Sequence, residues 1–373
     1  MSGETNRTKK RRKTKKRKRS IFRSLLLYFL FFTFVFIVGA TVSYRYITNA
    51  DKLTISEITK KIESGEAVEI EIPFNSSTDD IAKILKEKDV IKYPRIFKFL
   101  SFFNGHDGNY RAGRHLISKD LSYDEIMRVL SQNPISINVT IPEGKTFTET
   151  VEILAKNNLI DKEDFIKTAS EEKFDYKFLE GLPEREFPLE GYLFPDTYFF
   201  DPKSTSKMVI RKFLDNFNIK FTPEFYKRAE ELDMTVDEVI TLASIIERET
   251  KIPEEKEIVS SVFHNRLKSN DPSFKKLQSC ATIQYILLQR DGKVKENLTY
   301  EDTQIEHPYN TYLHEGLPPG PLCSPGLDSI IAALYPNEES DYMFFVARGD
   351  GSHEFSRTLQ EHEAAKQKYG VSY

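Results

Sequence analysis

The sequence contains no tryptophan and only two cysteines among its 373 residues. Two cysteines are too few for a disulfide-rich mini-protein or for a cysteine-rich zinc or iron–sulfur module. The sequence also lacks a glycine-rich phosphate loop, a G-x-S-x-G motif and an H-E-x-x-H motif. Because these signatures of phosphate binding, serine catalysis and metal binding are missing, we expect neither a cofactor nor a metal.

Acidic residues are scarce at the start of the chain. Residues 1–23 hold 12 Lys/Arg and one acid, whereas residues 24–373 hold 42 Lys/Arg and 56 acids. The chain is therefore a basic arm on an acidic body. An acidic body does not suit the nucleic-acid backbone, so we expect no nucleic-acid partner.

A run of 21 residues without charge follows the basic arm, at residues 24–44. At about 1.5 Å per residue a helix of this length spans about 31 Å, which matches the hydrocarbon core of a bilayer. Positive charge favours the cytoplasmic side, so the N-terminus stays inside and the body is exported. We predict a cytoplasmic arm at 1–23 and a single-pass anchor of the cytoplasmic (inner) membrane at 24–46.

Two alternatives to an anchor remain open. A cleaved signal peptide has an apolar region of only 7–15 residues and a small-residue cleavage site, and the best local site, at Gly39–Ala40, is poor. The arm could instead be a nuclear or nucleic-acid tract. Directly before a membrane helix, a basic arm is more simply a topology signal that contacts anionic lipids.

Residues 51–135 predict a small α+β module. Val68 to Ile72 alternate like a strand, Ser76 to Asp80 open a helix, Tyr110 to Ser118 indicate a second strand and Ser122 opens another helix. Apolar pairs of this module, from Ile72-Pro73 to Ile96-Phe97, recur 69 residues later. The recurrence predicts two copies of a strand–helix–helix unit. Such a module either binds carbohydrate or acts as a spacer.

Residues 136–373 predict a mixed α+β domain. Ser206 to Phe217 and Thr222 to Leu232 are expected to be helices, and residues 271–326 form a Pro-, Gly- and Asn-rich stretch. A stretch of that length without long periodic runs is usually functional in a compact domain. The complete expectation is an α+β chain with one N-terminal transmembrane helix, a small module and a larger domain.

One helix of this domain places a carboxylate among apolar residues. Thr235 and Glu238 form a capping box for the segment that ends near Thr250. At 100° per residue, Glu247 lies on the apolar stripe, whereas Glu249 lies at its edge. An apolar setting raises the pKa of a carboxyl group, as a general acid near neutral pH requires. The alternative is that the helix ends here and Glu247 simply reaches solvent.

Several polar and aromatic segments accompany this glutamate. Amides, hydroxyls and tyrosines suit a sugar polymer, because rings stack on aromatic side chains and sugar hydroxyls bond to neutral amides. The candidate substrate-binding residues are Glu190, Tyr192, Asp196, Tyr198, Asn265, Arg266, Gln278, Ser279, Tyr309, Asn310 and Tyr312.

At these residues the chain resembles the YceG-like family, the endolytic murein transglycosylases. The motifs that carry the resemblance are EGYLFPDTY (190–198), LASIIERE (242–249), SVFHNRL (261–267), LQS (277–279), YNTY (309–312), GLPPGPLCSPG (316–326) and GSHEFSRTLQEH (351–362). Their order and spacing fit over residues 137–373, and the anchor and small module fit before them. Cys280 stands where an Asp is common in the family.

The resemblance implies a lyase that cuts peptidoglycan strands internally between N-acetylmuramic acid and N-acetylglucosamine and leaves a 1,6-anhydro end. It implies that Glu247 is the acid/base residue and that the module at 51–135 is LysM-like and binds glycan. It also implies action on strands newly made by cell-wall synthases, whose growth the cleavage terminates. One carboxylate suffices because the substrate's own 6-hydroxyl is the nucleophile.

Two rival functions remain open from the sequence. The first is a muramidase with two carboxylates, Glu190 and Glu247, since hydrolases typically use a pair. The second is a non-catalytic glycan-binding scaffold of the cell-wall synthesis machinery.

The two cysteines, Cys280 and Cys323, both lie within family motifs of the exported domain. Export permits oxidation, so a disulfide between them is one expectation. Two separate buried thiols are the alternative.

Overall fold

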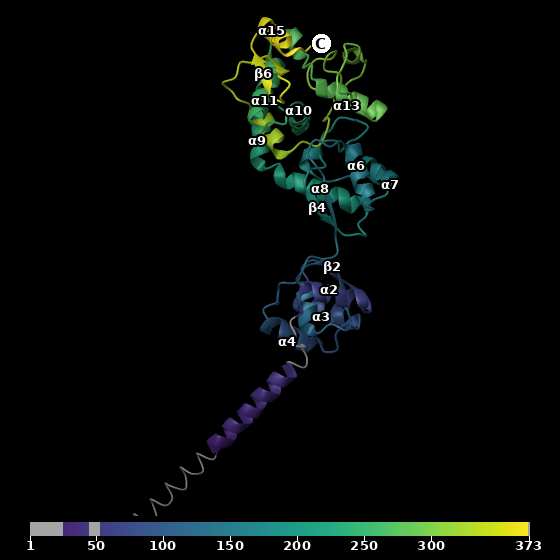
Figure 1. Cartoon of the computed structure of the whole chain (residues 1–373), viewed down its shortest axis with the longest axis vertical. Helices are drawn as coiled ribbons and strands as arrows, with labels where there is room; N and C mark the ends of the chain where they lie inside the picture. The colour runs from purple at the N-terminus through teal and green to yellow at the C-terminus, as the bar shows by residue number, and fades with distance from the viewer. Residues whose placement is uncertain (1–24, 45–52, 372–373) are drawn as a thin grey trace, which may run out of the picture. The chain divides into compact units, whose positions relative to one another are not determined.

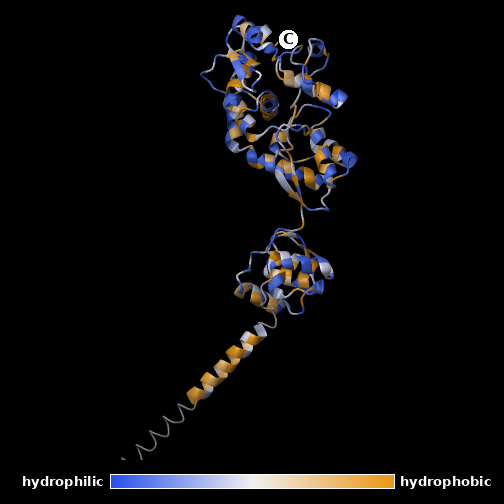
Figure 2. Cartoon of the chain, in the orientation of Figure 1, coloured by the Kyte–Doolittle hydropathy of each residue, from blue (hydrophilic) through white to orange (hydrophobic). Residues whose placement is uncertain are grey.

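The computed structural model describes residues 25–44 and 53–371, so the predicted basic arm at 1–23 lies outside the described residues. One helix of the described part, Leu25–Tyr44, is long and apolar enough to cross a membrane. Its 20 residues are exposed almost throughout, and Figure 2 shows that most of this helix is coloured as hydrophobic.

The chain divides into two compact units, of which the first ends at Ile135 and the second begins at Ser136. The first unit contains a two-stranded antiparallel sheet in which Ala67 pairs with Ser118 and Ile72 with Gly113. Helices cover this sheet around a core that includes Ile70, whose side chain is fully buried. The elements after the apolar helix are α2 (Ile55–Ser64), β1 (Ala67–Ile72), α3 (Thr78–Glu87), α4 (Pro94–Phe103), β2 (Gly113–Ser118) and α5 (Tyr123–Leu130).

The second unit opens with the strand–helix–helix unit that the 69-residue recurrence predicts. Helix α3 corresponds in register to α6 (Phe147–Lys156), while β1 and α4 correspond within one residue to β3 (Ile137–Thr140) and α7 (Lys162–Glu171). Even the caps repeat, because Ser77 with Asp80 and Thr146 with Glu149 both form capping boxes. The prediction of two copies is confirmed at the level of secondary structure.

The rest of the second unit is mainly helical, with two short sheets. Strand β3 pairs with β4 and strand β5 with β6, both antiparallel. The elements after α7 are η1 (Lys177–Leu179), β4 (Thr197–Phe200), α8 (Ser206–Lys220), α9 (Pro223–Glu231), α10 (Val236–Glu249), α11 (Pro253–Lys268), α12 (Pro272–Lys275), α13 (Cys280–Asp291), η2 (Asp302–Gln304), α14 (Leu327–Leu334), β5 (Phe344–Ala347), β6 (His353–Ser356) and α15 (Leu359–Tyr369).

Helix α10 is the central helix of the second unit, with α9, α11, α13 and α14 packed around it (Figure 1). The predicted capping box of Thr235 and Glu238 is present. Polar residues in the middle of α10 do not reach solvent. Thr241 is 2% exposed and Ser244 is fully buried, with its hydroxyl bonded to the Thr241 carbonyl oxygen. A helix surrounded on all sides buries both of its faces.

The Pro-, Gly- and Asn-rich stretch at 271–326 contains a 12-residue helix, α13, that the sequence did not predict. Loops surround this helix on both sides. Their backbone is held by side chains: the Asn310 amide, for example, donates to the carbonyl oxygens of Thr303 and Ile305 at 3.0 and 2.8 Å.

Candidate active site

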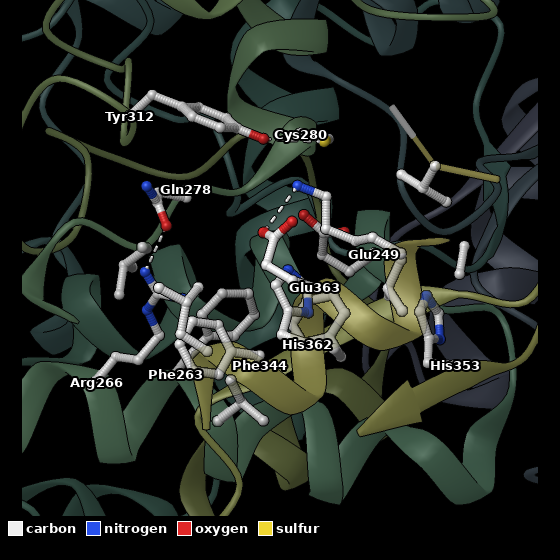
Figure 3. Close-up of a pocket in the computed structure, with 18 residues that line it drawn as sticks. Glu249, Phe263, Arg266, Gln278, Cys280, Tyr312, Phe344, His353, His362 and Glu363 are labelled. Atoms are coloured by element: carbon white, nitrogen blue, oxygen red, sulfur yellow. Dashed lines mark hydrogen bonds and ion pairs between the residues drawn. The ribbon is translucent and has the colours of Figure 1, made fainter. Parts of the chain in front are cut away.

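A pocket of about 430 Å³ lies between α11, the start of α13, the β5–β6 hairpin and α15 (Figure 3). Its walls combine aromatic rings with titratable and amide side chains, as is usual for a ligand site. The residues that line it are Glu249, Val262, Phe263, Arg266, Leu277, Gln278, Cys280, Tyr312, Phe344, Phe345, Val346, Ala347, His353, Leu359, His362, Glu363, Lys366 and Val371.

Glu249, the last residue of α10, is the carboxylate that α10 contributes to this pocket. The Ser279 hydroxyl donates a hydrogen bond to its Oε1, and the Ala281 backbone N–H reaches the same oxygen at 3.4 Å. Burial raises the pKa of Glu249, while these two hydrogen bonds favour the ionised form and oppose that rise. Burial and hydrogen bonding thus act in opposite directions on the pKa of Glu249, and the net shift is upward.

The LQS and YNTY segments meet at the pocket, although 30 residues of chain separate them. The Gln278 N–H donates to the Thr311 carbonyl oxygen at 3.0 Å, and the Ser279 N–H donates to the Thr311 hydroxyl at 3.0 Å. Gln278 has a φ of 53°, an unusual conformation for a residue with a side chain. Arg266 fixes it by donating to its Oε1 at 2.8 Å. These bonds fix the loop that carries the hydrogen-bond donor of Glu249.

Glu247, the predicted acid, lies elsewhere and does not line this pocket. Its Oε2 accepts hydrogen bonds from the Ser329 hydroxyl at 2.6 Å and the Gly326 N–H at 3.2 Å, at the N-terminus of α14. Lys256 lies 3.3 Å from the same oxygen, and the Glu247 side chain is 11% exposed. Glu247 thus caps α14 and joins it to α10 and α11. The assignment of Glu247 as the acid/base residue stays a prediction.

The EGYLFPDTY segment belongs to the core rather than to the pocket. Glu190 is 1% exposed, and both of its carboxylate oxygens accept from the Phe147 N–H, at 2.9 and 3.1 Å. Tyr192 is fully buried and donates to Asp237, whereas Tyr198 donates to the Phe194 carbonyl oxygen. These residues were predicted to touch substrate. In the structure they pack the centre of the second unit.

Four more predicted residues lie outside the pocket lining. Asp196 is exposed and accepts from the Asn216 amide at 3.1 Å, and Asn265 donates to the carbonyl oxygens of Ser340 and Tyr342. Tyr309 packs against Tyr285, with 4.9 Å between the ring centroids, and Asn310 is fully buried. Of the predicted substrate-binding residues, Arg266, Gln278 and Tyr312 line the pocket and Ser279 bonds its carboxylate.

The expected disulfide is absent from the described residues. Cys280 lies at the pocket, with its sulfur 3.2 Å from the Tyr312 hydroxyl. Cys323 is fully buried, and its thiol donates to the Ser244 carbonyl oxygen at 3.6 Å. The two sulfurs have different partners on different elements, so the two motifs do not bring them together.

The C-terminal segment supplies pocket residues that the sequence analysis did not single out, although it quoted their motif. His353 is held by Glu255, which accepts from its N–H at 3.0 Å and lies 2.7 Å from its Nδ1. Helix α15 adds His362 and the ion pair of Lys366 with Glu363, at 3.2 Å. The His362 ring stacks on Phe344, with 5.0 Å between centroids. The motif GSHEFSRTLQEH was the signal that could have identified this wall.

A family model described as the YceG-like family matches residues 70–368. The chain belongs to this family. It is 33% identical over 320 residues to an endolytic murein transglycosylase of Bacillus subtilis and covers 86% of that protein. It is 28% identical to an endolytic murein transglycosylase of Streptococcus pneumoniae, of which it covers 64%.

A crystal structure of a YceG-like protein from Listeria monocytogenes has the same fold. It is 32% identical in sequence, and the match covers 81% of this chain and 99% of the Listeria chain with a TM-score of 0.52. The fold and the family therefore agree with the resemblance carried by the motifs.

Proposed function

We propose that this chain is an endolytic murein transglycosylase whose acid/base residue is Glu249. The observation that carries the proposal is a half-buried, hydrogen-bonded carboxyl group with a raised pKa in a pocket of the second unit. Membership of a family whose curated relatives carry that enzyme name supplies the substrate class. We prefer Glu249 to the first expectation, Glu247, whose carboxylate caps α14 and pairs with Lys256.

The pocket suits a lytic reaction in which one carboxyl group acts twice. Protonated Glu249 gives its proton to the glycosidic oxygen as the bond from that oxygen to C1 of N-acetylmuramic acid breaks. The Ser279 hydroxyl and the Ala281 N–H stabilise the carboxylate formed in this step. The carboxylate then takes the proton of the sugar's own 6-hydroxyl as that oxygen bonds to C1. Water does not enter the product, which ends in 1,6-anhydro-N-acetylmuramic acid.

The burial of Glu190 argues against the muramidase alternative. A retaining or inverting hydrolase needs two carboxylates that both face the scissile bond. Glu190 is 1% exposed and bonded to the Phe147 backbone, and Glu247 is bonded to α14. Neither one lines the pocket.

The product and two matched glutamine variants test this assignment. Full-length protein in detergent micelles is incubated with purified glycan strands in ¹⁸O-labelled water, and the ends are analysed by mass spectrometry before and after borohydride treatment. We expect anhydro ends that are neither reduced nor labelled. Glu249→Gln should lower activity by at least about 10²-fold with folding intact, since it removes the proton donor.

The matched variant is Glu247→Gln, two residues away on the same helix. We expect it to lose stability but to keep most of its activity per folded molecule. The reverse pattern would return the acid/base role to Glu247. Labelled, reducible ends would support a muramidase, and a wild-type chain without activity would support the scaffold alternative.

We further propose that Leu25–Tyr44 anchors the chain in the cytoplasmic membrane with the second unit outside. Its 20 apolar residues and the basic arm before it support this topology. Protease added to spheroplasts should remove residues beyond about Asp51 and leave the basic arm intact. A soluble mature protein that begins near Thr41 would show instead that the helix is a signal sequence.

We also propose that the module at 51–135 is LysM-like and binds glycan, and that the enzyme cuts strands as membrane-bound synthases make them. The β-α-α-β arrangement of the module supports the first part. Deleting the module should weaken binding to polymeric strands more than to short fragments, because a second site raises the effective concentration. Loss of the enzyme should lengthen glycan strands in cells if it terminates their growth.

A further inference from the structure

Helix α4 of the first unit has an apolar face that the described residues leave largely exposed. Phe99, Phe102 and Phe103 are 65%, 74% and 69% exposed. They lie on one face because residues three and four apart are neighbours on a helix, and the rings of Phe99 and Phe103 stack at 6.2 Å. The opposite face, with Phe97 and Leu100, is buried in the core. A helix that is apolar on both faces needs an apolar partner on its outer face.

The outer face of α4 is continuous with the end of the apolar helix Leu25–Tyr44. The Tyr44 hydroxyl donates to Asn104 Oδ1 at 3.0 Å, and the Tyr44 ring lies edge-on to Phe103 with 6.1 Å between centroids. Only residues 45–52 separate Tyr44 from Leu53, a chain that reaches at most about 30 Å when extended. The module therefore lies close to the surface of any membrane that the helix Leu25–Tyr44 spans.

The charges on this face match a bilayer surface. Arg95 and Lys98 are exposed on the same side of α4 as the three phenylalanines, and Lys98 forms an exposed ion pair with Asp79. Phenylalanines flanked by cationic side chains are typical of helices that lie in the membrane interface, where rings enter the acyl boundary and cations meet anionic headgroups. Sugar-binding faces instead combine aromatic rings with amides and carboxylates, and the Asn104 amide already donates to Asp124.

We propose that the outer face of α4, formed by Phe99, Phe102 and Phe103 with Arg95 and Lys98, docks on the surface of the membrane that holds Leu25–Tyr44. This inference rests on the membrane anchor proposed above. Two attachments, the helix in the bilayer and the face on its surface, fix the orientation of the module.

The absence of tryptophan from the chain makes the test direct, because one introduced tryptophan is the only indole in the protein. Three full-length variants are reconstituted separately in vesicles of phosphatidylcholine and phosphatidylglycerol whose acyl chains carry bromine, a quencher of indole fluorescence. Phe102→Trp reports on α4. Leu116→Trp, on β2 and 41% exposed, is the control in the same module, and Phe32→Trp reports on the anchor helix.

We expect Phe102→Trp emission to shift to the blue and to fall at least about twofold in brominated vesicles, since the ring would enter the acyl boundary. Leu116→Trp should not change. If Phe102→Trp behaves like Leu116→Trp while Phe32→Trp is quenched, the docking proposal is wrong and the anchor stands. If Phe32→Trp is not quenched either, the anchor itself is wrong. A Phe102→Trp signal that responds to soluble glycan strands and not to bromine would assign the face to glycan.

Discussion

Glu190 provides a quantitative test of how burial shifts the pKa of a carboxyl group and makes the stability of this fold depend on pH. Burial raises its pKa to about 8, although the backbone N–H groups of Phe147 and Gly191 favour the ionised form. In the unfolded chain the group returns to about 4.5. The protonated form is thus preferred in the folded state. The contribution of protonated Glu190 to the free energy of unfolding is fully present below pH 4.5 and is lost as the pH rises toward 8.

The expected size of the effect follows from these two values. Between them, each pH unit costs about 1.4 kcal/mol of the free energy of unfolding, so the interval from pH 5 to pH 7 costs roughly 3 kcal/mol. Glu190→Gln is neutral at every pH and keeps an oxygen that accepts from the Phe147 N–H. The variant should lack this loss, and its stability advantage over the wild type should grow by roughly 3 kcal/mol between pH 5 and pH 7.

Urea unfolding of the full-length chain in detergent micelles, followed by far-UV circular dichroism, measures the difference. With a slope of about 3 kcal/mol per molar urea, the midpoints of variant and wild type should diverge by about 1 M across this interval. Glu184→Gln, at an exposed position six residues earlier, should follow the wild type at every pH. Parallel curves for Glu190→Gln and wild type would refute the reasoning, because they would mean that Glu190 is ionised in the folded protein.

Three further changes test the site and its supports. Ser279→Ala removes a hydrogen-bond donor to ionised Glu249 and so raises the pKa of that acid. Because the acid must be protonated to act, the fall of kcat/KM with rising pH should move to higher pH by up to about one unit. A pH–rate profile measures this shift. Gly191→Ala should destabilise the fold by about 2–4 kcal/mol in urea unfolding, since φ is 90° there and a Cβ would lie 2.6 Å from a proline ring carbon. Lys256→Met leaves the Glu247 carboxylate without its cation and should lower the free energy of unfolding by about 3–5 kcal/mol. Adding Glu247→Gln to the same chain should restore most of this loss. A double variant as unstable as the single one would contradict the pairing.

Local patterns in the sequence predicted the local structure well. The capping box of Thr235 and Glu238 and the strand at β1 are confirmed, because each depends on residues only a few positions apart within one element. The 69-residue recurrence is confirmed because each copy repeats the same local patterns. Helix α13 was missed because its apolar residues are not confined to one stripe and its neighbours are rich in Pro, Gly and Asn. Hydrophobic periodicity does not identify a helix of this kind when loop-forming residues surround it.

The site was harder to predict because distant segments create it. The helical wheel placed Glu247 on the apolar stripe and Glu249 at its edge, but it gave no information on which element covers each direction. The structure assigns Glu247 to the end of α14 and Glu249 to the pocket beside Ser279, 30 residues away in the chain. The aromatic and acidic residues of 190–198 were chosen for their chemistry. Their burial is a tertiary property that residue type alone does not reveal.

The two cysteines differ so much in their surroundings that only one of the two thiols, that of Cys280, is accessible to reagents. Burial raises the pKa of the Cys323 thiol well above its ordinary value, and the side chain has no exposed surface. We therefore expect that alkylating reagents do not react with Cys323. Cys280 is partly exposed and lines the same pocket as Glu249. A fluorophore, a spin label or an electrophilic sugar can therefore be attached beside the acid of the unaltered protein, and the rate of that attachment would report directly on whether glycan occupies the site.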